Sequence, residues 1–312
     1  MSTPLVSIVV ASYNASRSIV ETLDSIKAQT YSPLELIIAD DCSQDDTAAK
    51  CKEWLTENQF RFANSKLIVN SENKGTSANF NIGIKASSGE WIKIFGDDVL
   101  LPDAIEKNVA FAKENDSDIV SSKMRYYFDE TSEMSTIVPP DDYIFPISNH
   151  DQFIAQIQNK LGAPAPTWFI KRELYDRLGG FNEHYRLFED IPFAHKLVES
   201  GFCFSYMPQL TVLYRITNVS ISNNHHLTGK QKQASFNDRF AIFNELQEPA
   251  LKEHGLWGVL IKYKLTYFFY KKKIYSRDDS IARYFYGGLC YVFFKLLYMK
   301  NPLPKPGRLK SR

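Results

Sequence analysis

The sequence has few cysteines, and their arrangement fits neither a disulfide framework nor a zinc site. The four cysteines among 312 residues form no C-x-x-C pair and have no histidine at zinc-ligand spacing. Buried thiols in a reducing compartment are therefore expected. The first residues, MSTPLVSIVVASYN, include no basic leader and no small-residue cleavage site. They predict a first strand and not a signal peptide.

Several other signals are missing. Neither G-x-x-x-x-G-K-[ST] nor G-x-G-x-x-G occurs, which excludes a P-loop and a standard dinucleotide turn. No nucleic-acid recognition motif accompanies the basic residues, so nucleic acid is not an expected partner. The apolar run YFYGGLCYVFFKLLYMK contains Lys295 and is short for a bilayer span, which needs about 20 residues.

Charge is unevenly distributed along the chain. Residues 251–312 contain 14 Lys and Arg against 3 Asp and Glu, which leaves 23 against 33 in the remainder. This acidic body with a basic, aromatic end predicts contact with an anionic surface. Aromatics at the headgroup level with lysines on anionic lipid would suit an interfacial helix pair. An ordinary helical cap with its basic face in water is the alternative.

The first hundred residues alternate between strand and helix patterns. Apolar runs at 5–11, 34–39, 66–69 and 91–95 predict buried strands, and the segments between them have helical spacing. Ser43 and Asp46 match a capping box at the start of the second helix. The alternation predicts an α/β fold with an open, mostly parallel sheet and flanking helices.

Polar clusters follow three of the predicted strands. They are Ser12-Tyr13-Asn14, Asp40-Asp41 and Asp97-Asp98. Ligands of open α/β sheets bind outside the carboxyl ends of the strands, so these clusters mark the expected site. By itself the pair Asp97-Asp98 has three interpretations: a helix cap, the acidic pocket of a metal-dependent phosphotransfer domain, or a cation site completed by a diphosphate.

Four blocks of sequence together resemble the family-two glycosyltransferases, which are mostly inverting enzymes with the GT-A fold. The blocks are PLVSIVVASYN, SIKAQTYSPLELIIADDCSQDDT, ENKGTSANFNIGIKASSGEWIKIFGDDVLLPDAI and LGGFNEHYRLFEDIPFAHKL. They span roughly residues 4–215 in order. The resemblance implies a nucleotide-sugar donor and a divalent metal, Mn²⁺ or Mg²⁺.

The resemblance also implies site residues. Tyr13 would stack on the base, and Asp41 would accept the base N3–H, which favours uracil or thymine; without the resemblance, Asp41 could equally start a capping turn. Asp98 is the first candidate metal ligand, and Asp97 lies on the ribose or sugar side or shares the metal. The predicted nucleotide-sugar-binding residues are Ser12, Tyr13, Asn14, Asp41, Asn81 and Asp97.

Glu189 and Asp190 match the family's E-D motif. Inversion needs a general base on the acceptor hydroxyl, which fits Asp190, with Glu189 orienting it or raising its pKa. The alternative is an N-capping acid pair on the following helix. Gly179-Gly180 would allow close approach of the acceptor or form a helix C-cap. Trp168 would be a sugar platform or, more simply, a core residue.

The chain departs from the family pattern at two places. Phe80 precedes Asn81 where many relatives have a basic residue, for which Lys74 would compensate. Thr217 stands where relatives often have His, and His225 or His226 would supply the missing contact.

These observations predict a catalytic domain at residues 1–220 and a helical, membrane-associated region at 221–312. The catalytic domain divides into a nucleotide-binding half (1–100) and an acceptor half (101–220). The expected reaction is metal-dependent transfer of a hexose or N-acetylhexosamine from a UDP-sugar to a lipid-linked oligosaccharide. The expected pathway is O-antigen, lipopolysaccharide or capsule synthesis, on the cytoplasmic face of the bacterial inner membrane. A dTDP-sugar (rhamnosyl) transferase and an inactive nucleotide-sugar-binding scaffold are the alternatives.

Overall fold

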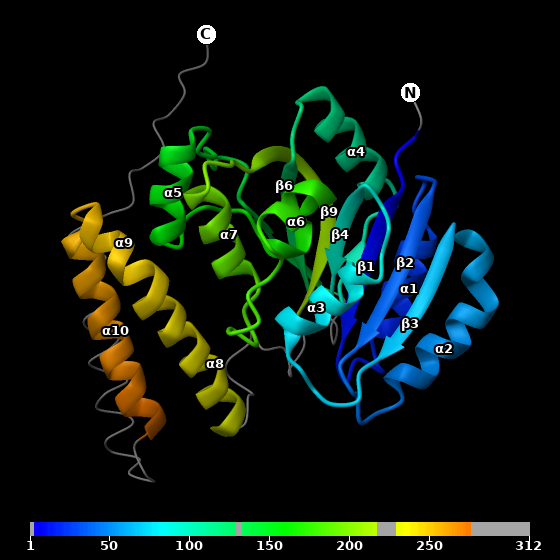
Figure 1. Cartoon of the computed structure of the whole chain (residues 1–312), viewed down its shortest axis with the longest axis horizontal. Coiled ribbons are helices and arrows are strands. Elements are labelled where there is room, and N and C mark those ends of the chain that lie inside the picture. Colours follow the sequence, from blue (N-terminus) through cyan, green and yellow to red (C-terminus); the bar gives the residue numbers. More distant parts are fainter. Residues whose placement is uncertain (1–2, 129–132, 217–228, 276–312) are drawn as a thin grey trace. The chain divides into compact units, whose positions relative to one another are not determined.

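The structure is a computed structural model that describes residues 3–128, 133–216 and 229–275 (Figure 1). The contacts divide the chain into two compact units. Unit 1 comprises Met1–Asp141 and Phe145–Thr217, and unit 2 comprises Asp142–Ile144 and Asn218–Arg312. His225, His226, Thr217 and the apolar run around Lys295 lie outside the described residues, as do the expectations attached to them.

The described part of unit 1 is built on one mixed sheet. Its order is β3-β2-β1-β4-β8-β6-β9-β5, with β7 paired to β6. The strands are β1 (Val6–Ser12), β2 (Leu34–Asp40), β3 (Asn64–Val69), β4 (Trp91–Phe95), β5 (Val99–Leu100), β6 (Ile119–Phe128), β7 (Glu133–Val138), β8 (Phe169–Lys171) and β9 (Ser205–Ile216). The β3-β2-β1-β4 part is parallel, as predicted.

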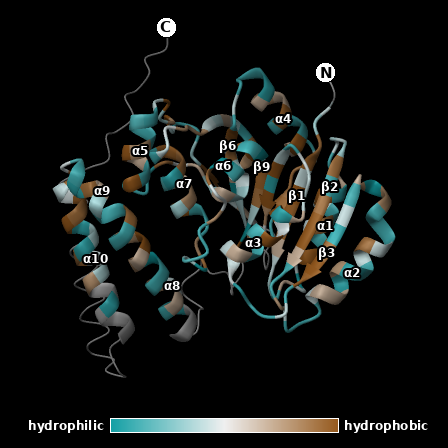
Figure 2. Cartoon of the chain, in the orientation of Figure 1, coloured by the Kyte–Doolittle hydropathy of each residue, from teal (hydrophilic) through white to brown (hydrophobic). Residues whose placement is uncertain are grey.

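The parallel strands are covered on both faces. Val6, Ile8 and Val10 pack in one core with α1 (Ile19–Lys27) and α2 (Thr47–Asn58). The intervening Val9 faces α3 (Thr76–Lys85), where a Cβ added at Gly83 would lie 2.5 Å from Val9 Cγ1. Coverage of both faces explains why β1 and β2 are hydrophobic over most of their length (Figure 2).

The second half of unit 1 adds antiparallel and parallel pairs. β8 lies antiparallel between β4 and β6, and β6 runs parallel to β9. Its helices are α4 (Ala104–Glu114), α5 (Asn149–Ile157), α6 (Arg172–Arg177) and α7 (Asp190–Glu199). Trp168 is buried against Phe193 and Phe204, and its Nε1 donates to Ala163 O at 3.0 Å. Trp168 is therefore a core residue and not a sugar platform.

The predicted capping box at Ser43 and Asp46 is wrong. Helix α2 starts at Thr47, whose backbone N–H donates to Asp45 Oδ1 at 3.1 Å, and Asp46 makes no side-chain cap. Ser43 Oγ instead donates to Asp40 Oδ1 at 2.5 Å, which ties the end of β2 to the following turn. The first N–H of the helix is thus bonded to Asp45 instead of the expected pair, and Ser43 is bonded to the end of β2.

Unit 2 is helical in its described residues. It contains α8 (Gly229–Ile242), the π-helical segment η3 (Phe243–Gln247), α9 (Glu248–Glu253) and α10 (Trp257–Tyr275). Phe236, Phe240 and Phe243 contact Tyr267 of α10, so aromatic rings fill the space between these helices. Among the described helices, none is both long and apolar enough to cross a bilayer.

Candidate functional site

The three polar clusters meet at the carboxyl edge of the parallel strands. β1 and β2 run in register with Ser12 opposite Asp40, and Val10 lies opposite Phe95 of β4. The residues that follow these strands therefore lie at one edge of the sheet. This is the convergence expected from the strand pattern, and it defines the candidate site.

At the end of β1, Ser12 is buried, whereas Tyr13 and Asn14 are exposed. Ser12 Oγ is buried and donates to Asp40 Oδ1 at 3.2 Å. Asn14 Oδ1 accepts from the N–H of Gln44 at 2.8 Å. Tyr13 is 50% exposed, which leaves its ring available for stacking. Ser12 and Asn14 join two loops of the site, whereas Tyr13 faces outward.

Asp41 is committed to the loop that precedes α3. It is 3% exposed, and its carboxylate accepts hydrogen bonds from the N–H groups of Lys74 and Gly75, both at 2.8 Å. Asn70 Nδ2 donates a third at 3.0 Å. A carboxylate has about four acceptor positions, so a base N3–H would have to use the remaining one.

Asn81 connects α3 to the loop that follows α6. Its Nδ2 donates to Phe181 O at 2.9 Å and to Glu183 Oε1 at 2.8 Å. Its Oδ1 accepts from Phe181 N–H at 3.0 Å and from the hydroxyl of Tyr175. The whole carboxamide is thus used within the protein, and Asn81 touches a ligand only if these bonds rearrange.

Two glycines allow this close packing. Gly179 and Gly180 both have φ of +74°, and the N–H of Gly180 donates to Tyr175 O at 3.1 Å as in a helix C-cap. A Cβ at Gly180 would lie 2.9 Å from the Tyr175 hydroxyl and 3.2 Å from Asn81 Oδ1. Of the two predicted roles for these glycines, the C-cap is the one that the contacts support.

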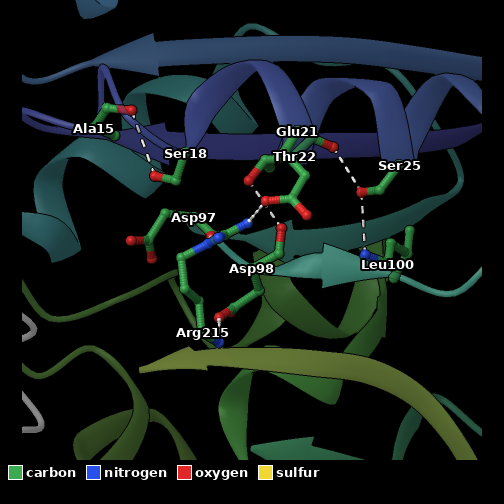
Figure 3. A network of polar contacts seen from close by, with 9 residues as sticks. All are labelled: Ala15, Ser18, Glu21, Thr22, Ser25, Asp97, Asp98, Leu100 and Arg215. Carbon is green, nitrogen blue, oxygen red and sulfur yellow. Dashed lines mark hydrogen bonds and ion pairs between the residues drawn. The ribbon is translucent and has the colours of Figure 1, made fainter. Parts of the chain in front are cut away.

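Asp97 and Asp98 point in different directions (Figure 3). Asp98 is buried, and its Oδ1 accepts from the N–H of Arg215 in β9 at 2.9 Å. Burial and the adjacent charge of Asp97 raise the pKa of Asp98, although the Arg215 N–H and the charge of Lys93 oppose the shift. Asp97 is partly exposed. Its carboxylate is therefore the more accessible of the two.

A cation at this edge would need ligands from elsewhere. Within the described residues, no group of three or more His, Cys, Asp or Glu side chains could hold a metal ion by itself. Mg²⁺ and its relatives are commonly held by one or two carboxylates together with substrate phosphates. A partly exposed Asp97 beside the buried Asp98 fits a site of that shared kind.

Glu189 and Asp190 lie where α7 begins. Asp190 Oδ1 accepts from the N–H of Ile191 at 2.7 Å, so the pair contacts the helix N-terminus. Loss of solvent and the charge of Asp190 raise the pKa of Glu189. The start of α7 therefore carries two adjacent acids, and the neutral form of Glu189 is more favoured than that of an exposed glutamate.

Sequence reasoning missed residues that support the site from outside the three clusters. Arg215 Nε donates to Asp97 O at 2.7 Å, and the guanidinium of Arg215 pairs with Glu21. Thr22 Oγ1 donates to Asp98 O at 2.8 Å. The available signal was the polar spacing in and just after the first helix, where Thr22, Ser25 and Gln29 recur at i, i+3 and i+7.

The sequence matches a known family over more than half of its length. The model described as "Glycosyl transferase family 2" matches residues 7–179. Glycosyltransferase GlyG of Streptococcus pneumoniae is 27% identical over 234 residues, 70% of this chain and 72% of GlyG. Putative glycosyltransferase EpsE of Bacillus subtilis is 35% identical over 113 residues, 36% of this chain and 40% of EpsE.

A third relative has a more specific name. It is UDP-Glc:alpha-D-GlcNAc-diphosphoundecaprenol beta-1,3-glucosyltransferase WfgD of Escherichia coli. It is 33% identical over 112 residues, 36% of this chain and 42% of WfgD. The aligned segments thus span less than half of the length of EpsE and of WfgD.

Solved structures resemble the fold across nearly the whole chain. S. aureus TarS 1–349 in complex with UDP-GlcNAc has a TM-score of 0.58 at 15% identity, covering 95% of this chain and 90% of TarS 1–349. The mannosyltransferase PcManGT from Pyrobaculum calidifontis, in complex with GDP-Man and Mn²⁺, has a TM-score of 0.57 at 16% identity. That match covers 97% of this chain and 88% of PcManGT. The α/β fold of GT-A type expected from the sequence is confirmed.

Proposed function

The chain belongs to glycosyl transferase family 2, and from this premise we propose that it transfers a hexose or N-acetylhexosamine from a UDP-sugar to a hydroxyl group of an oligosaccharide. The observation that carries the proposal is the carboxyl edge of β1, β2 and β4. There Tyr13 and Asp97 are accessible, while Ser12, Asn14 and Asp41 hold the surrounding loops in place.

The proposed donor contacts follow from this division of roles. Tyr13 stacks on the uracil, which is worth about 1–3 kcal/mol per base for an aromatic side chain. Asp41 uses its remaining acceptor position for the base N3–H, and Asp97 faces the ribose and the diphosphate. Asn14, Ser12 and Asn81 shape the pocket through the bonds they make inside the protein.

The cofactor in this proposal is Mn²⁺ or Mg²⁺, held by Asp97 and Asp98 together with the donor diphosphate. When bound, the cation supplies positive charge that neutralises the departing diphosphate. Asp98 is buried, and its Oδ1 is already bonded to the N–H of Arg215 at 2.9 Å, which leaves Oδ2 for the cation. Asp97 is partly exposed and is therefore the more accessible of the two.

Asp190 is the proposed general base. It takes the proton of the acceptor hydroxyl as that oxygen attacks the anomeric carbon, which gives inversion in a single displacement. Burial and the charge of Asp190 raise the pKa of Glu189, which favours the neutral form of Glu189 and lowers the repulsion between the two side chains.

We infer a lipid-linked acceptor, and the reason is the basic end of the chain together with one relative. WfgD is named for a diphosphoundecaprenol-linked acceptor. In unit 2 the described part of α10 exposes Trp257, Ile261 and Phe268, and it contains no acidic residue. A cytoplasmic, peripheral position on the inner membrane would bring such an acceptor within reach, in O-antigen, lipopolysaccharide or capsule synthesis.

Two alternatives differ in observable ways. A dTDP-sugar (rhamnosyl) transferase would use the same base contacts, because thymine and uracil share the N3–H. A nucleotide-sugar-binding scaffold without activity would keep Tyr13 and Asp97 and lose transfer.

Calorimetric titration separates these readings. UDP, dTDP and CDP are titrated into the full chain with Mn²⁺ and again with chelator. We expect UDP to bind with Mn²⁺ at least about tenfold more tightly than without it, and CDP to bind weakly because it lacks the N3–H. A preference for dTDP would favour the rhamnosyl alternative. Absence of binding by all three nucleotides would contradict the proposal.

A further inference from the structure

The backbone of residues 96–98, called the acid loop below, is held from two sides by residues of distant elements (Figure 3). One side is β9, through Arg215. The other is α1, through a line of polar side chains. None of these residues was expected at the site from the sequence motifs.

Arg215 contacts the acid loop through both its main chain and its side chain. Its N–H donates to Asp98 Oδ1 at 2.9 Å, and its Nε donates to Asp97 O at 2.7 Å. The guanidinium also pairs with Glu21 of α1 and lies 5.4 Å from the ring centroid of Tyr127. The Arg215 side chain is 1% exposed, so the geometry of these contacts is confined.

Helix α1 holds the other side of the same segment. Thr22 Oγ1 donates to Asp98 O at 2.8 Å, and Ser25 Oγ accepts from the N–H of Leu100 at 3.1 Å. Gln29 Nε2 donates to Leu101 O at 2.8 Å. Thr22 and Ser25 are one helical turn apart on the same face of α1, and Gln29 follows just after the end of the helix, so the three side chains follow the chain from the acid loop through β5.

The open side of the acid loop is where a ligand has room. A Cβ added at Gly96 would meet no described atom within 4 Å. Asp97, next in the chain, is partly exposed, and its carboxylate points away from the Arg215 contacts (Figure 3). Fixing the Asp97 carbonyl therefore fixes the direction in which the Asp97 carboxylate leaves the loop.

We propose that Arg215, braced by Glu21 and Thr22, is a positioning residue that aims the Asp97 carboxylate at the cation and diphosphate of the bound nucleotide. The inference rests on the proposed function. The ion pair joins a buried guanidinium to a half-exposed carboxylate, since the side chains of Arg215 and Glu21 are 1% and 50% exposed. Glu21 orients the guanidinium, and the Nε of Arg215 holds the carbonyl of Asp97, which an apolar side chain could not bind.

Arg61 supplies a matched control. Its guanidinium likewise donates to main-chain carbonyls, those of Lys27, Gln29 and Tyr31, and lies 5.8 Å from the ring centroid of Phe62. These carbonyls lie at the last residue of α1 and in the segment between α1 and β2, at the amino edge of the sheet. Arg61→Met removes comparable contacts from unit 1, and its one link toward the acid loop is the main chain of Gln29, whose side chain bonds to Leu101 and not to residues 96–98.

The experiment titrates UDP into the full chain and into each variant, with Mn²⁺ and with chelator. Arg215→Met is expected to weaken UDP binding at least about tenfold with Mn²⁺, and by less than about twofold with chelator. Arg215→Lys keeps the charge but not the two-nitrogen fork, so an intermediate loss is expected. Arg61→Met should bind UDP as the unaltered chain does, even if it is less stable.

Two further variants and a second readout keep the test decisive if Arg215→Met does not fold. Glu21→Gln and Thr22→Val each remove one brace and should weaken UDP binding only with Mn²⁺. Amide hydrogen exchange at residues 96–100, measured without nucleotide, should become faster in each variant.

An unchanged affinity for UDP with Mn²⁺ in the folded variants, or an equal loss of UDP affinity with and without metal, would overturn the inference. Failure of the unaltered chain to bind UDP would instead overturn the proposed function, and the inference with it.

Discussion

Asp190 occupies a position at which two roles coincide, the start of α7 and the proposed reacting centre. As a helix-terminal acid it bonds to the N–H of Ile191 and interacts favourably with the helix dipole. As a general base it accepts a proton from the acceptor. The first role contributes to folding and the second only to transfer, so one substitution can separate them.

We predict that Asp190→Asn lowers the rate of transfer by about 10²–10⁴-fold and leaves UDP binding unchanged, because an amide cannot accept the proton but still fits the helix terminus. The measurements are kcat with a UDP-sugar and an acceptor, and a calorimetric UDP titration.

Asp103→Asn is the matched control for that variant. Asp103 is the N-cap residue of α4 and pairs with Lys107 at 2.7 Å. It therefore reports what the same change costs at an ordinary helix start. If Asp190→Asn transfers sugar as fast as Asp103→Asn does, Asp190 only caps the helix.

At the scale of single residues, the sequence predicted which polar residues lie together at the sheet edge, but not which of their side chains are accessible to a ligand. Asp41 and Asn81 are of residue types typical of binding sites, yet their polar atoms bond to backbone groups more than 30 positions away in the chain. Arg215 was not recognised because its partners, Asp97 and Glu21, are 118 and 194 positions away. Partners at such distances follow from the fold and not from local spacing.

At the scale of elements, the packing of α3 on β1 depends on one missing methyl group. Gly83 lies within α3, where alanine is ordinarily better by about 1 kcal/mol. Here a Cβ would lie 2.5 Å from Cγ1 of the fully buried, stiff Val9. The helix sits close to the sheet because the side chain is absent.

We predict that Gly83→Ala destabilises the protein by about 1–3 kcal/mol in denaturant unfolding, because the overpacking outweighs the gain in helix propensity. Gly258→Ala in α10 is the control, since no described atom lies within 4 Å of its added Cβ. Gly258 is in the first turn of α10, where helix propensity counts less than in a helix interior, so that change should leave the stability unchanged or slightly higher. A Gly83→Ala variant as stable as the unaltered chain would show that α3 can move away from β1.

Elements with strong patterns were predictable, and short or antiparallel ones were not. The strands β1, β2 and β4 are buried on both faces, so their apolar runs were evident in the sequence. Strands β5 and β8 have two and three residues, too few for any periodicity. Helix α5 follows a proline-rich stretch and was not expected, although Ser148 caps it by accepting from Asp151 N–H.

At the scale of the whole molecule, positive and negative charge separate along the chain. The basic excess lies in residues 251–312, and the described part of α10 adds exposed apolar side chains to it. Trp257 and Ile261 are 56% and 54% exposed and lie one helical turn apart. Each lysine close to an anionic membrane contributes about 1 kcal/mol, and each inserted apolar side chain adds to it.

We predict that the full chain sediments with vesicles that contain anionic phospholipid and not with neutral vesicles. Salt at about 1 M should release it, because the Debye length then falls to about 3 Å. The double variant Trp257→Ser, Ile261→Ser should bind several-fold more weakly, because its lysines still attract the lipid but its apolar side chains no longer insert into the membrane.

Phe60→Ser is the control, since Phe60 is 79% exposed in unit 1 and lies outside the basic region. If Phe60→Ser weakens binding as much as the double variant, attachment depends on general surface hydrophobicity and not on α10. If vesicle charge makes no difference, the basic end has a role other than membrane contact.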